Sequence, residues 1–420
     1  MGFLRILHTA DWHLGKTLEG RDRTEEQVQF IDELCQICDK EKVDLIVIAG
    51  DIYQTVNPSA VAEQLFYEAL ERLSDQGKKG VIVIAGNHDN PERISAPAPL
   101  ANRHGITLIG LPYSPLLPMS FSTQTVQRIA AGPSWCEVAV PSCEHSAVVL
   151  AVPYPSEARL NQVLADSFDE SIIAKAYNER VKNLFSALSA HYKKDSVNLA
   201  FSHLYVQGGL ESESEIQIQV GGAYAVDPSV FPGNADYVGL GHLHRPQRVF
   251  GTTVPTRYAG SPLAYSFSEA GQQKSVTIID ITPGSPADIR EIPLCSGKQL
   301  LRYRAEHGLA QVYDWLNHRQ NQDAFVDLEI FLDEPLTQEI TQRLRNQHPG
   351  LIHIRPVFSS LEKEQAQASV RGLSIEEMFV RFFKDRFHVE PDEAITQLFL
   401  QLAQDMHDDR AKPNAKGDDA

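Results

Sequence analysis

The sequence lacks the features of secreted and membrane-embedded proteins. None of its apolar runs approaches the ~20 residues that a transmembrane helix requires. Its opening residues, MGFLRILHTADWH, do not combine a basic region, an apolar region and a small-residue cleavage site, so we predict no signal peptide. The sixth position is Ile6, where a myristoylation signal has Ser or Thr. These absences predict a cytoplasmic protein without membrane contact.

Positive charge is also scarce. The 420 residues contain 38 Lys and Arg against 55 Asp and Glu, a formal net charge of −17. Such a chain is not expected to coat nucleic acid through bulk positive charge. An enzyme acting on DNA would need a local basic groove, divalent metal ions that offset phosphate charge, or a partner that holds the DNA.

Cysteine is rare and odd in number. The five cysteines are Cys35, Cys38, Cys136, Cys143 and Cys295. The first two form a C-x-x-C, but within FIDELCQICDK, which has the periodicity of an amphipathic helix. Because no second C-x-x-C completes a zinc site, we predict reduced thiols and no thiolate metal site.

The first 280 residues alternate apolar runs with segments of helical period. The apolar runs predict strands at RILHTADWH, VDLIVIAGD, GVIVIAGNHD, SAVVLAVPY, VNLAFSH and DYVGLGH. Most are continuously apolar, as is typical of strands covered on both faces. Residues 24–42 and 57–77 predict helices, the second with Asn57 as N-cap and Pro58 at its first position. This alternation predicts an α/β fold.

The character of the sequence changes near Pro283, in the turn-rich segment ITPGSPAD. Two short strands, a helix, a strand, a helix and a strand are predicted from there to Phe358, which indicates a small separate α/β unit. Beyond it, Ser374 stands three residues before Glu377 in a capping box that begins a helix. The tail from Asp408 has the composition of disorder. We therefore divide the chain into residues 1–282, 283–358, 359–407 and 408–420.

Five of the predicted strands end on side chains that can bind metal. These side chains are Asp11, His13, Asp51, Asn87, His88, Asp89, His203, His242 and His244. In open α/β sheets, ligands collect outside the carboxyl ends of the strands. One H-x-H pair among 15 histidines is weak evidence, but five strands that end in this way predict one shared site.

The donor set is chemically uniform. Leaving out His88 and Asp89, it has two carboxylates, four imidazoles and one amide, without a thiolate. Such nitrogen and oxygen donors suit Mn²⁺, Fe or Zn²⁺. Seven donors exceed the needs of one tetrahedral site and fit two metal ions ~3.5–4 Å apart that share a carboxylate.

In this order along the chain, D-x-H, G-D, G-N-H-D, S-H and G-H-x-H resemble the calcineurin-like metallophosphoesterase superfamily over residues 3–280. The resemblance implies a β-sandwich flanked by helices. It implies one metal ion held by Asp11, His13, Asp51 and His244, and a second held by Asp51, Asn87, His203 and His242. Asp51 would then bridge the two ions. His88 would not be a ligand, but would stand over the phosphate as a proton donor or electrostatic stabiliser.

Longer stretches narrow the resemblance to the SbcD family of bacterial nuclease subunits. They are HTADWHLGKTLEGRDR, AGDIYQTVNPS, AGNHDNPER, DYVGLGHLHRPQ and YAGSPLAYSFSE. This similarity implies Mn²⁺-dependent 3′–5′ exonuclease activity on double-stranded DNA ends and endonuclease activity on hairpins or single strands. The implied processes are DNA repair, recombination and replication. Archaeal relatives carry a further histidine where this chain has Gln54, so we assign no second catalytic histidine.

The same resemblance implies partners. A small capping domain would touch DNA, and the C-terminal helices would bind an SMC-like ATPase, SbcC, in a heterotetramer with two copies of each subunit. A homodimer would form through helices of the catalytic domain. Phe379, Phe382, Phe383 and Phe387, at helical spacing, form either the ATPase-docking face or an internal core.

Several other residues have two interpretations. Asp89 either orients His88 or caps a helix that begins at Pro91, while His8, in mid-strand, is interpreted as a core residue. Five residues either contact phosphates or are ordinary surface residues. They are Lys16, Arg21, Arg23, Tyr154 and Arg159.

Three functions stay open from the sequence. The first is a DNA nuclease subunit of an ATP-dependent complex. The second is a stand-alone metallophosphatase or phosphodiesterase, which leaves the last 138 residues (420 minus 282) without a role. The third is a scaffold with a decayed site, against which the complete set of seven ligands argues.

Overall fold

The computed structural model describes residues 2–160, 170–215, 224–318, 321–358, 374–387, 391–392 and 395–400. The chain divides into two compact units. The first contains residues 1–302, 321–327 and 349–352, and the second contains 303–320, 328–348 and 353–420. The predicted tail 408–420 lies outside the described residues. Among the described helices, none has both the length and the apolar character needed to cross a membrane.

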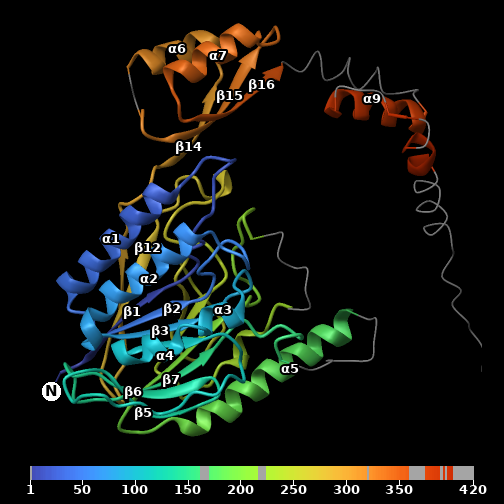
Figure 1. The fold of residues 1–420 in the computed structure, drawn as a ribbon. Helices are drawn as coiled ribbons and strands as arrows, with labels where there is room; N and C mark the ends of the chain where they lie inside the picture. The colour runs from blue at the N-terminus through green and yellow to red at the C-terminus, as the bar shows by residue number, and fades with distance from the viewer. Residues whose placement is uncertain are drawn as a thin grey trace, which may run out of the picture. The chain divides into compact units, whose positions relative to one another are not determined.

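The first unit contains two sheets (Figure 1). The six-stranded sheet has the order β13-β12-β1-β2-β3-β4, and the seven-stranded sheet has the order β10-β11-β9-β8-β7-β6-β5. The strands of the first are β1 (Leu4–Thr9), β2 (Leu45–Ala49), β3 (Gly80–Ile84), β4 (Ile106–Ile109), β12 (Ser275–Ile281) and β13 (Asp288–Pro293). Those of the second are β5 (Gln127–Gly132), β6 (Trp135–Ala139), β7 (Ala147–Val152), β8 (Val197–His203), β9 (Tyr237–Gly241), β10 (Gln247–Arg248) and β11 (Thr256–Tyr258).

Four layers follow from the way the central strands divide their side chains. Ile46 and Ile48 of β2 belong to the core under the helices, whereas Val47 belongs to a second core that also contains Val149 and Leu199 of the other sheet. Adjacent strand residues point to opposite faces, so β2 is apolar on both. This explains the continuous apolar runs and confirms the predicted sandwich flanked by helices.

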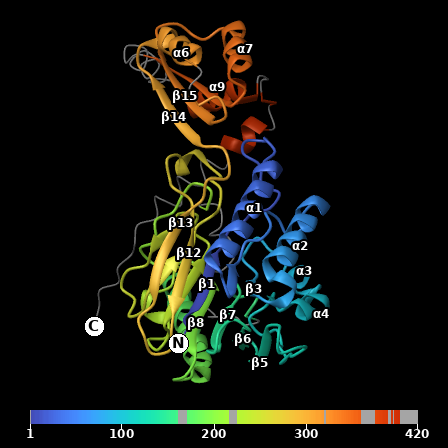
Figure 2. The same cartoon turned by 90° about the vertical axis from the view of Figure 1, so that its left-hand side faces the viewer.

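Helices cover the two outer faces (Figures 1 and 2). Over the six-stranded sheet lie α1 (Thr24–Glu41) and α2 (Ala60–Ser74), followed in the chain by the short α3 (Pro91–Ser95) and α4 (Ala98–Ala101). Over the seven-stranded sheet, α5 (Glu170–Leu188) buries Tyr177, Val181 and Phe185. Single 3₁₀ turns occupy Asp75–Gly77, Asn102–His104, Ser189–His191, Pro228–Val230 and Phe267–Glu269.

The predicted start of α2 is wrong by two residues. The helix begins at Ala60, and its N-cap is Ser59, whose hydroxyl accepts a hydrogen bond from the Ala62 backbone N–H at 3.2 Å. Serine is as good an N-cap as asparagine. Residue type alone therefore does not distinguish Asn57 from Ser59 as the N-cap. The choice depends on the backbone conformation of the preceding turn, which the sequence does not show.

The remaining strands form a three-stranded sheet of order β14-β15-β16, with bounds Leu300–Ala305, Phe325–Leu332 and Leu351–Phe358. Two helices, α6 (Gly308–Asn317) and α7 (Gln338–Gln347), lie between these strands in the chain, and α9 (Ile375–Phe387) follows them. The predicted order of elements is confirmed from β14 onward. The first strand after Pro283 differs, since β13 pairs with β12 and extends the six-stranded sheet. The division at residue 283 stays a prediction.

Candidate metal centre

Parallel pairing places the ends of five strands at one edge of the sandwich. β1 pairs with β2 and β2 with β3 in one sheet, and β8 pairs with β9 in the other, all in parallel. Asp11, His13, Asp51, His203 and His244 are each at most 1% exposed at these ends. Asn87, His88 and His242 are partly exposed and form the accessible side of the cluster.

The backbone at these strand ends is strained. Asp11, His13, Asp51 and His242 have φ of 54°, 46°, 50° and 105°, in the left-handed region that non-glycine residues rarely adopt. Such conformations persist where surrounding structure enforces them, and they concentrate at functional sites. The enforcing structure includes Gly86, where a Cβ would lie 2.1 Å from Asp51 Oδ1. Because residue 86 is glycine, the turn after β3 can approach the backbone of Asp51 more closely than any residue with a side chain would allow.

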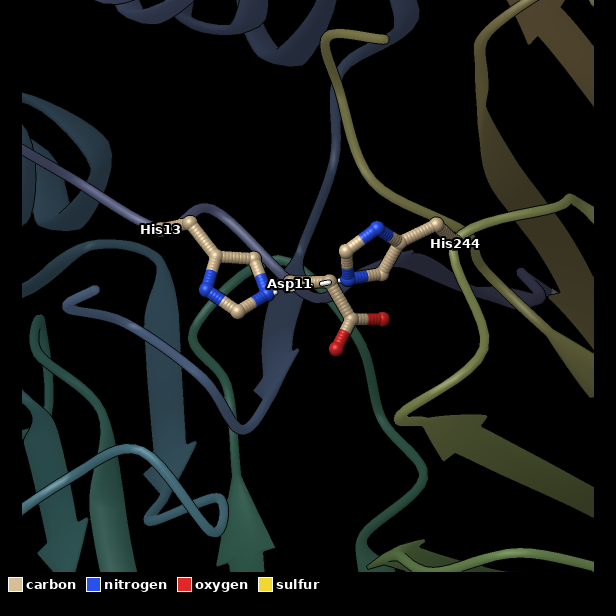
Figure 3. Close-up of side chains that lie close together, drawn as sticks. All are labelled: Asp11, His13 and His244. Carbon is tan, nitrogen blue, oxygen red and sulfur yellow. Dashed lines mark hydrogen bonds between the residues drawn. The ribbon is translucent and has the colours of Figure 1, made fainter. Parts of the chain in front are cut away.

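The first group of possible ligands is Asp11, His13 and His244 (Figure 3). The two imidazoles face each other with 3.0 Å between their Nε2 atoms. His244 Nδ1 lies 2.8 Å from the Ser214 hydroxyl, which donates its own proton to Glu269. Nδ1 of His244 therefore carries a proton, and its Nε2 turns a lone pair toward His13.

The second group surrounds His203. Its Nδ1 donates to the Ala49 carbonyl at 2.9 Å, so Nε2 is the nitrogen with the available lone pair. That Nε2 lies 2.8 Å from Asn87 Oδ1 and 3.4 Å from Asp51 Oδ2. His242 Nδ1 lies 3.2 Å from the same Asn87 oxygen. Either a proton on these ring nitrogens or a metal ion must therefore lie between the imidazoles and the oxygens of Asn87 and Asp51.

Asp51 joins the two groups. Its Oδ2 is 3.6 Å from His13 Nε2 and 3.4 Å from His203 Nε2. Asp11, Asp51 and His203 lie close enough to share an ion, as do Asp11, His13 and His244. The seven predicted residues therefore come together in the structure, and their donor set fits two divalent ions with a shared carboxylate.

Burial tunes these donors for metal binding. It lowers the pKa of His13 well below 6.5, that of His242 to about 3 and that of His244 to about 4. These imidazoles are therefore neutral at pH 7, the form that binds a metal. Burial also raises the pKa of the Asp11 carboxyl well above its usual value.

His203 and Asp51 behave oppositely to the other donors. Burial alone would lower the pKa of His203, but the Asp51 carboxylate raises it to about 9. Burial alone would raise the pKa of Asp51, but His203 holds it well below 3.8. A proton shared by this pair thus occupies the place that a cation would take.

His88 lies against the cluster. Its backbone N–H donates to Asp51 Oδ1 at 2.9 Å, and its ring Nδ1 donates to the Gln54 carbonyl at 2.8 Å. Nε2 is left buried without a partner. Its ring is 4.9 Å from that of His13, and His13, Asp51 and His88 form a third group that could hold an ion. The assignment of His88 to the phosphate stays a prediction.

Neither interpretation of Asp89 agrees with the structure. The Asp89 carboxylate accepts hydrogen bonds from the backbone N–H groups of Ile52, Tyr53 and Gly86 at 2.8–3.1 Å. Within the described residues it makes no hydrogen bond to the His88 ring. The N-cap of α3 is Asn90, whose Oδ1 accepts two backbone N–H bonds. Asp89 therefore holds the turn after β2 against the turn after β3.

Two predicted DNA contacts need correction. Arg23 is only 1% exposed and its guanidinium is bonded to the Glu26 carboxylate at 2.5 and 2.6 Å, so it cannot reach a phosphate. Arg159 donates to the carbonyls of Gly86 and Asp89, both at 2.6 Å. Arg159 therefore fixes the turn that carries Asn87, since both of its terminal nitrogens are committed.

The other three candidates differ in their exposure and surroundings. Arg21 is exposed. Lys16 is half-buried, with its Nζ 5.0 Å from the Tyr265 ring, and burial lowers its pKa. The Tyr154 ring lies nearly parallel to that of His242 with 6.5 Å between centroids. A contact between these residues and DNA stays a prediction.

Four residues of the site, three of them buried and Ser214 partly exposed, were not singled out in the sequence. Ser214, Glu215, Glu269 and Lys274 all contact His244 or one another. Glu269 ends the stretch YAGSPLAYSFSE, which the resemblance uses without giving it a role. Glu269 stands among serines in the sequence, and no spacing or motif there indicates that it lies close to His244 in the fold.

The phenylalanines of α9 divide between packed and exposed positions. Phe379 stacks on Phe399 with centroids 4.1 Å apart and also approaches Phe383. Phe382 is 63% exposed. The capping box between Ser374 and Glu377 is confirmed by hydrogen bonds in both directions. The side chain of Phe387 lies outside the described residues.

Comparison with known proteins agrees with this site. Residues 4–246 match the family model of the calcineurin-like phosphoesterases. Residues 297–387 match that of the type 5 capsule protein repressor C-terminal domain.

Two curated proteins, each the SbcD component of the nuclease SbcCD, are similar to the chain. The one from Bacillus subtilis is 48% identical over 97% of this chain and 100% of its own length. That from Rhodobacter capsulatus is 33% identical over 81% of this chain and 83% of its own. Among solved structures, GAP50 of Plasmodium covers 86% of this chain and 99% of its own at 12% identity and a TM-score of 0.35.

Proposed function

The chain belongs to the calcineurin-like phosphoesterases and, within them, to the family of the SbcD component of the nuclease SbcCD, and from this we propose its function in detail. It is a hydrolase of phosphodiester bonds. We propose a Mn²⁺-dependent DNA nuclease that acts as an exonuclease on double-stranded ends and as an endonuclease on hairpins or single strands. Its place is in the cytoplasm, in DNA repair, recombination and replication.

The convergence of hydrogen-bond acceptors at the strand ends carries this proposal. Asp51 Oδ2 lies within 3.4–3.6 Å of imidazole nitrogens from both groups, so one carboxylate serves both positions. The seven nitrogen and oxygen donors, without a thiolate, suit Mn²⁺. Two such ions, when bound, neutralise phosphate charge and activate water for attack on phosphorus.

The protein side chains around the ions position the DNA. We assign His88 Nε2, buried and without a partner, to the phosphate or to the leaving oxygen. Lys16 and Arg21 follow His13 in the chain and supply local positive charge that the acidic chain as a whole lacks. Arg159 and Asp89 fix the turn that carries Asn87 and His88.

The remaining residues serve partners. We propose that the α/β segment 283–358 contacts DNA. We propose that α9 binds the SMC-like ATPase SbcC in a complex with two copies of each subunit. The exposed Phe382 supports this docking role, since an apolar ring on the surface of a helix favours an interaction site.

One assay tests the activity. The purified chain with Mn²⁺ is offered linear duplex, hairpin DNA, single strands and a p-nitrophenyl phosphodiester, with and without the ATPase. We expect cleavage of hairpins and single strands, with ATP-dependent cleavage of duplex ends only when the ATPase is present. Hydrolysis of the small ester alone would favour a stand-alone phosphodiesterase.

A matched pair of variants ties this activity to the metal centre. Asp51→Asn should abolish cleavage of every substrate and weaken Mn²⁺ binding in calorimetry. Asparagine tolerates the left-handed backbone, so the substitution removes the charge and one acceptor oxygen without a change of backbone conformation. Asp75→Asn, at a similar φ of 45° but on the surface, should leave cleavage unchanged. Two Mn²⁺ ions bound to Asp51→Asn as tightly as to the wild type would refute the shared carboxylate.

A further inference from the structure

The backbone of His244 is fixed on both sides. Its N–H donates to the Glu215 carboxylate, and its carbonyl accepts from Lys274 Nζ at 2.8 Å and from the Ser261 backbone N–H at 3.1 Å. The position of this residue at the end of β9 is therefore set by residues 17 to 30 positions away in the chain. These backbone contacts do not fix the orientation of the His244 ring or the ring nitrogen that carries its proton.

Ser214 determines both. The Ser214 hydroxyl has one proton, and Glu269 Oε1, 3.0 Å away, is a carboxylate oxygen that can only accept it. The lone pairs of the same hydroxyl face His244 Nδ1 at 2.8 Å and the Ser212 hydroxyl at 2.7 Å. His244 must then donate from Nδ1, which leaves Nε2 deprotonated on the side of Asp11 and His13.

Glu269 is the last acceptor in the series of hydrogen bonds from His244 through Ser214, and its carboxylate is held in place by several contacts. It is fully buried, and Oε1 also accepts from the backbone N–H groups of Tyr265 and Ser266 at 3.0 and 3.1 Å. Oε2 pairs with Lys274 Nζ at 2.5 Å. Glu269 Oε1 is 3.7 Å from His244 Nδ1, beyond hydrogen-bonding distance. The serine is therefore the necessary intermediate between carboxylate and imidazole.

The other imidazoles do not depend on this serine. His203 Nδ1 is held by the Ala49 carbonyl, and His242 Nδ1 lies against Asn87. His13 Nδ1 is buried without a hydrogen-bond partner. Within the described cluster, the Ser214–Glu269 pair thus acts on the group of Asp11, His13 and His244, and not on the group that contains Asn87, His203 and His242.

We propose that Ser214 and Glu269 are positioning residues that fix the His244 ring for the first of the two metal ions, an inference that rests on the proposed two-metal function. Partners of this kind orient a ligating histidine and raise its basicity, and their loss typically costs ~10–100-fold in metal affinity. Ser214→Ala should therefore weaken one metal position and leave the other as it is.

Calorimetric titration of the full chain with Mn²⁺ tests this. The wild type should bind two ions, and Ser214→Ala should bind one of them ~10–100-fold more weakly with the second unchanged. Ser214→Thr keeps the hydroxyl and should restore the lost affinity. Ser268→Ala should match the wild type, since the Ser268 hydroxyl accepts from the Glu213 backbone N–H and has no hydrogen bond to His244.

Electron paramagnetic resonance gives a second measurement that does not depend on cleavage. At two equivalents of Mn²⁺ the wild type should show the signal of a spin-coupled pair, and Ser214→Ala should show isolated ions. Wild-type affinities in Ser214→Ala, or an equal weakening of both positions that threonine does not rescue, would overturn the positioning role. A wild type that binds fewer than two ions would overturn the two-metal function itself, and this inference with it.

Discussion

His88 differs from the other histidines of the centre because its ring is fixed but its outer nitrogen is free. Nδ1 donates to the Gln54 carbonyl, so Nε2 faces the cluster with a lone pair or, once protonated, with a donor. A metal-ligand role and a phosphate role make opposite predictions for its removal. The structure alone is compatible with both, because His88 also lies near Asp51 and His13.

We expect His88→Asn to lower turnover ~10²–10⁴-fold, the range of a general acid, while Mn²⁺ and DNA affinity stay as in the wild type. The reason is that His88 acts on the transition state and holds no ion in the ground state. Single-turnover cleavage and calorimetry measure the two quantities separately. His191→Asn, which removes an exposed ring stacked on Trp135, should change neither. Loss of one bound ion in His88→Asn would make His88 a ligand.

The shared proton of His203 and Asp51 gives a second prediction at this scale. His203 has a pKa of about 9, so it is protonated at pH 7.5, and a metal ion at its Nε2 must displace that proton. Mn²⁺ affinity should therefore rise as the pH increases toward 9. We therefore expect about one proton to be released per chain, and the raised pKa of Asp11 acts in the same direction.

Calorimetry in buffers of different ionisation enthalpy measures this release. His13, His242 and His244 should contribute nothing at pH 7.5, since burial holds their pKa values low. His203→Asn should reduce the number of released protons by about one. Binding without any proton release would mean that His203 is already neutral in the metal-free protein.

The sequence predicted the residues that come together in the cluster but not the residues that support them. Asp11, Asp51 and His203 follow buried strands, so the alternation of strands and helices along the chain is enough to place them at one edge. Ser214 and Glu269 reach His244 across 30 and 25 residues through hydrogen bonds of the tertiary fold. Likewise, Asp51 has a positive φ where its backbone packs against Gly86, 35 residues away in the chain, and this close approach leaves no room for a Cβ at position 86.

At the level of elements, burial favoured prediction but did not ensure it, since the buried strands β4 and β12 were not predicted. The long apolar strands such as β2 and β8 were predicted because both of their faces are covered. The two-residue β10 and the polar β13 were missed or misplaced, since neither carries a periodic signal. No residue of β13 is buried, and its partner β12 determines which sheet it joins.

α9 offers a prediction at this scale because its phenylalanines are not equivalent. Phe382→Ala should weaken capture of the ATPase SbcC by ~30-fold or more, the effect of losing a ~2 kcal/mol interface anchor. Cleavage of single strands without the ATPase should not change. Phe250→Ala, an exposed phenylalanine on the catalytic unit, serves as the control in the same pull-down and affinity measurement.

Truncation after Phe358 should abolish capture altogether. Full capture by the truncated chain would show that the ATPase docks elsewhere.

For the whole molecule, the apolar surface of α2 and α4 predicts self-association. Val61, Tyr67 and Leu100 are 58%, 41% and 72% exposed there, and Tyr67 and Leu100 line a cavity of about 380 Å³. We expect light scattering at micromolar concentration to give twice the chain mass of 46.8 kDa. Leu100→Glu should give a monomer, whereas Leu117→Glu, with 71% exposure outside α2 and α4, should not. A wild-type monomer would contradict the dimer.

The strand ends that form the centre belong to both sheets, and their residues extend from Asp11 to His244. No unfolded chain presents these donors together, so any ion bound here binds the folded sandwich in preference to the unfolded chain and stabilises it in proportion to RT ln(1 + [Mn²⁺]/Kd). Metal binding at this centre would therefore stabilise the packing of the two sheets against each other. The size of this stabilisation would depend on the metal concentration in the cell. Metal starvation would then lower both the activity of this nuclease and its free energy of unfolding.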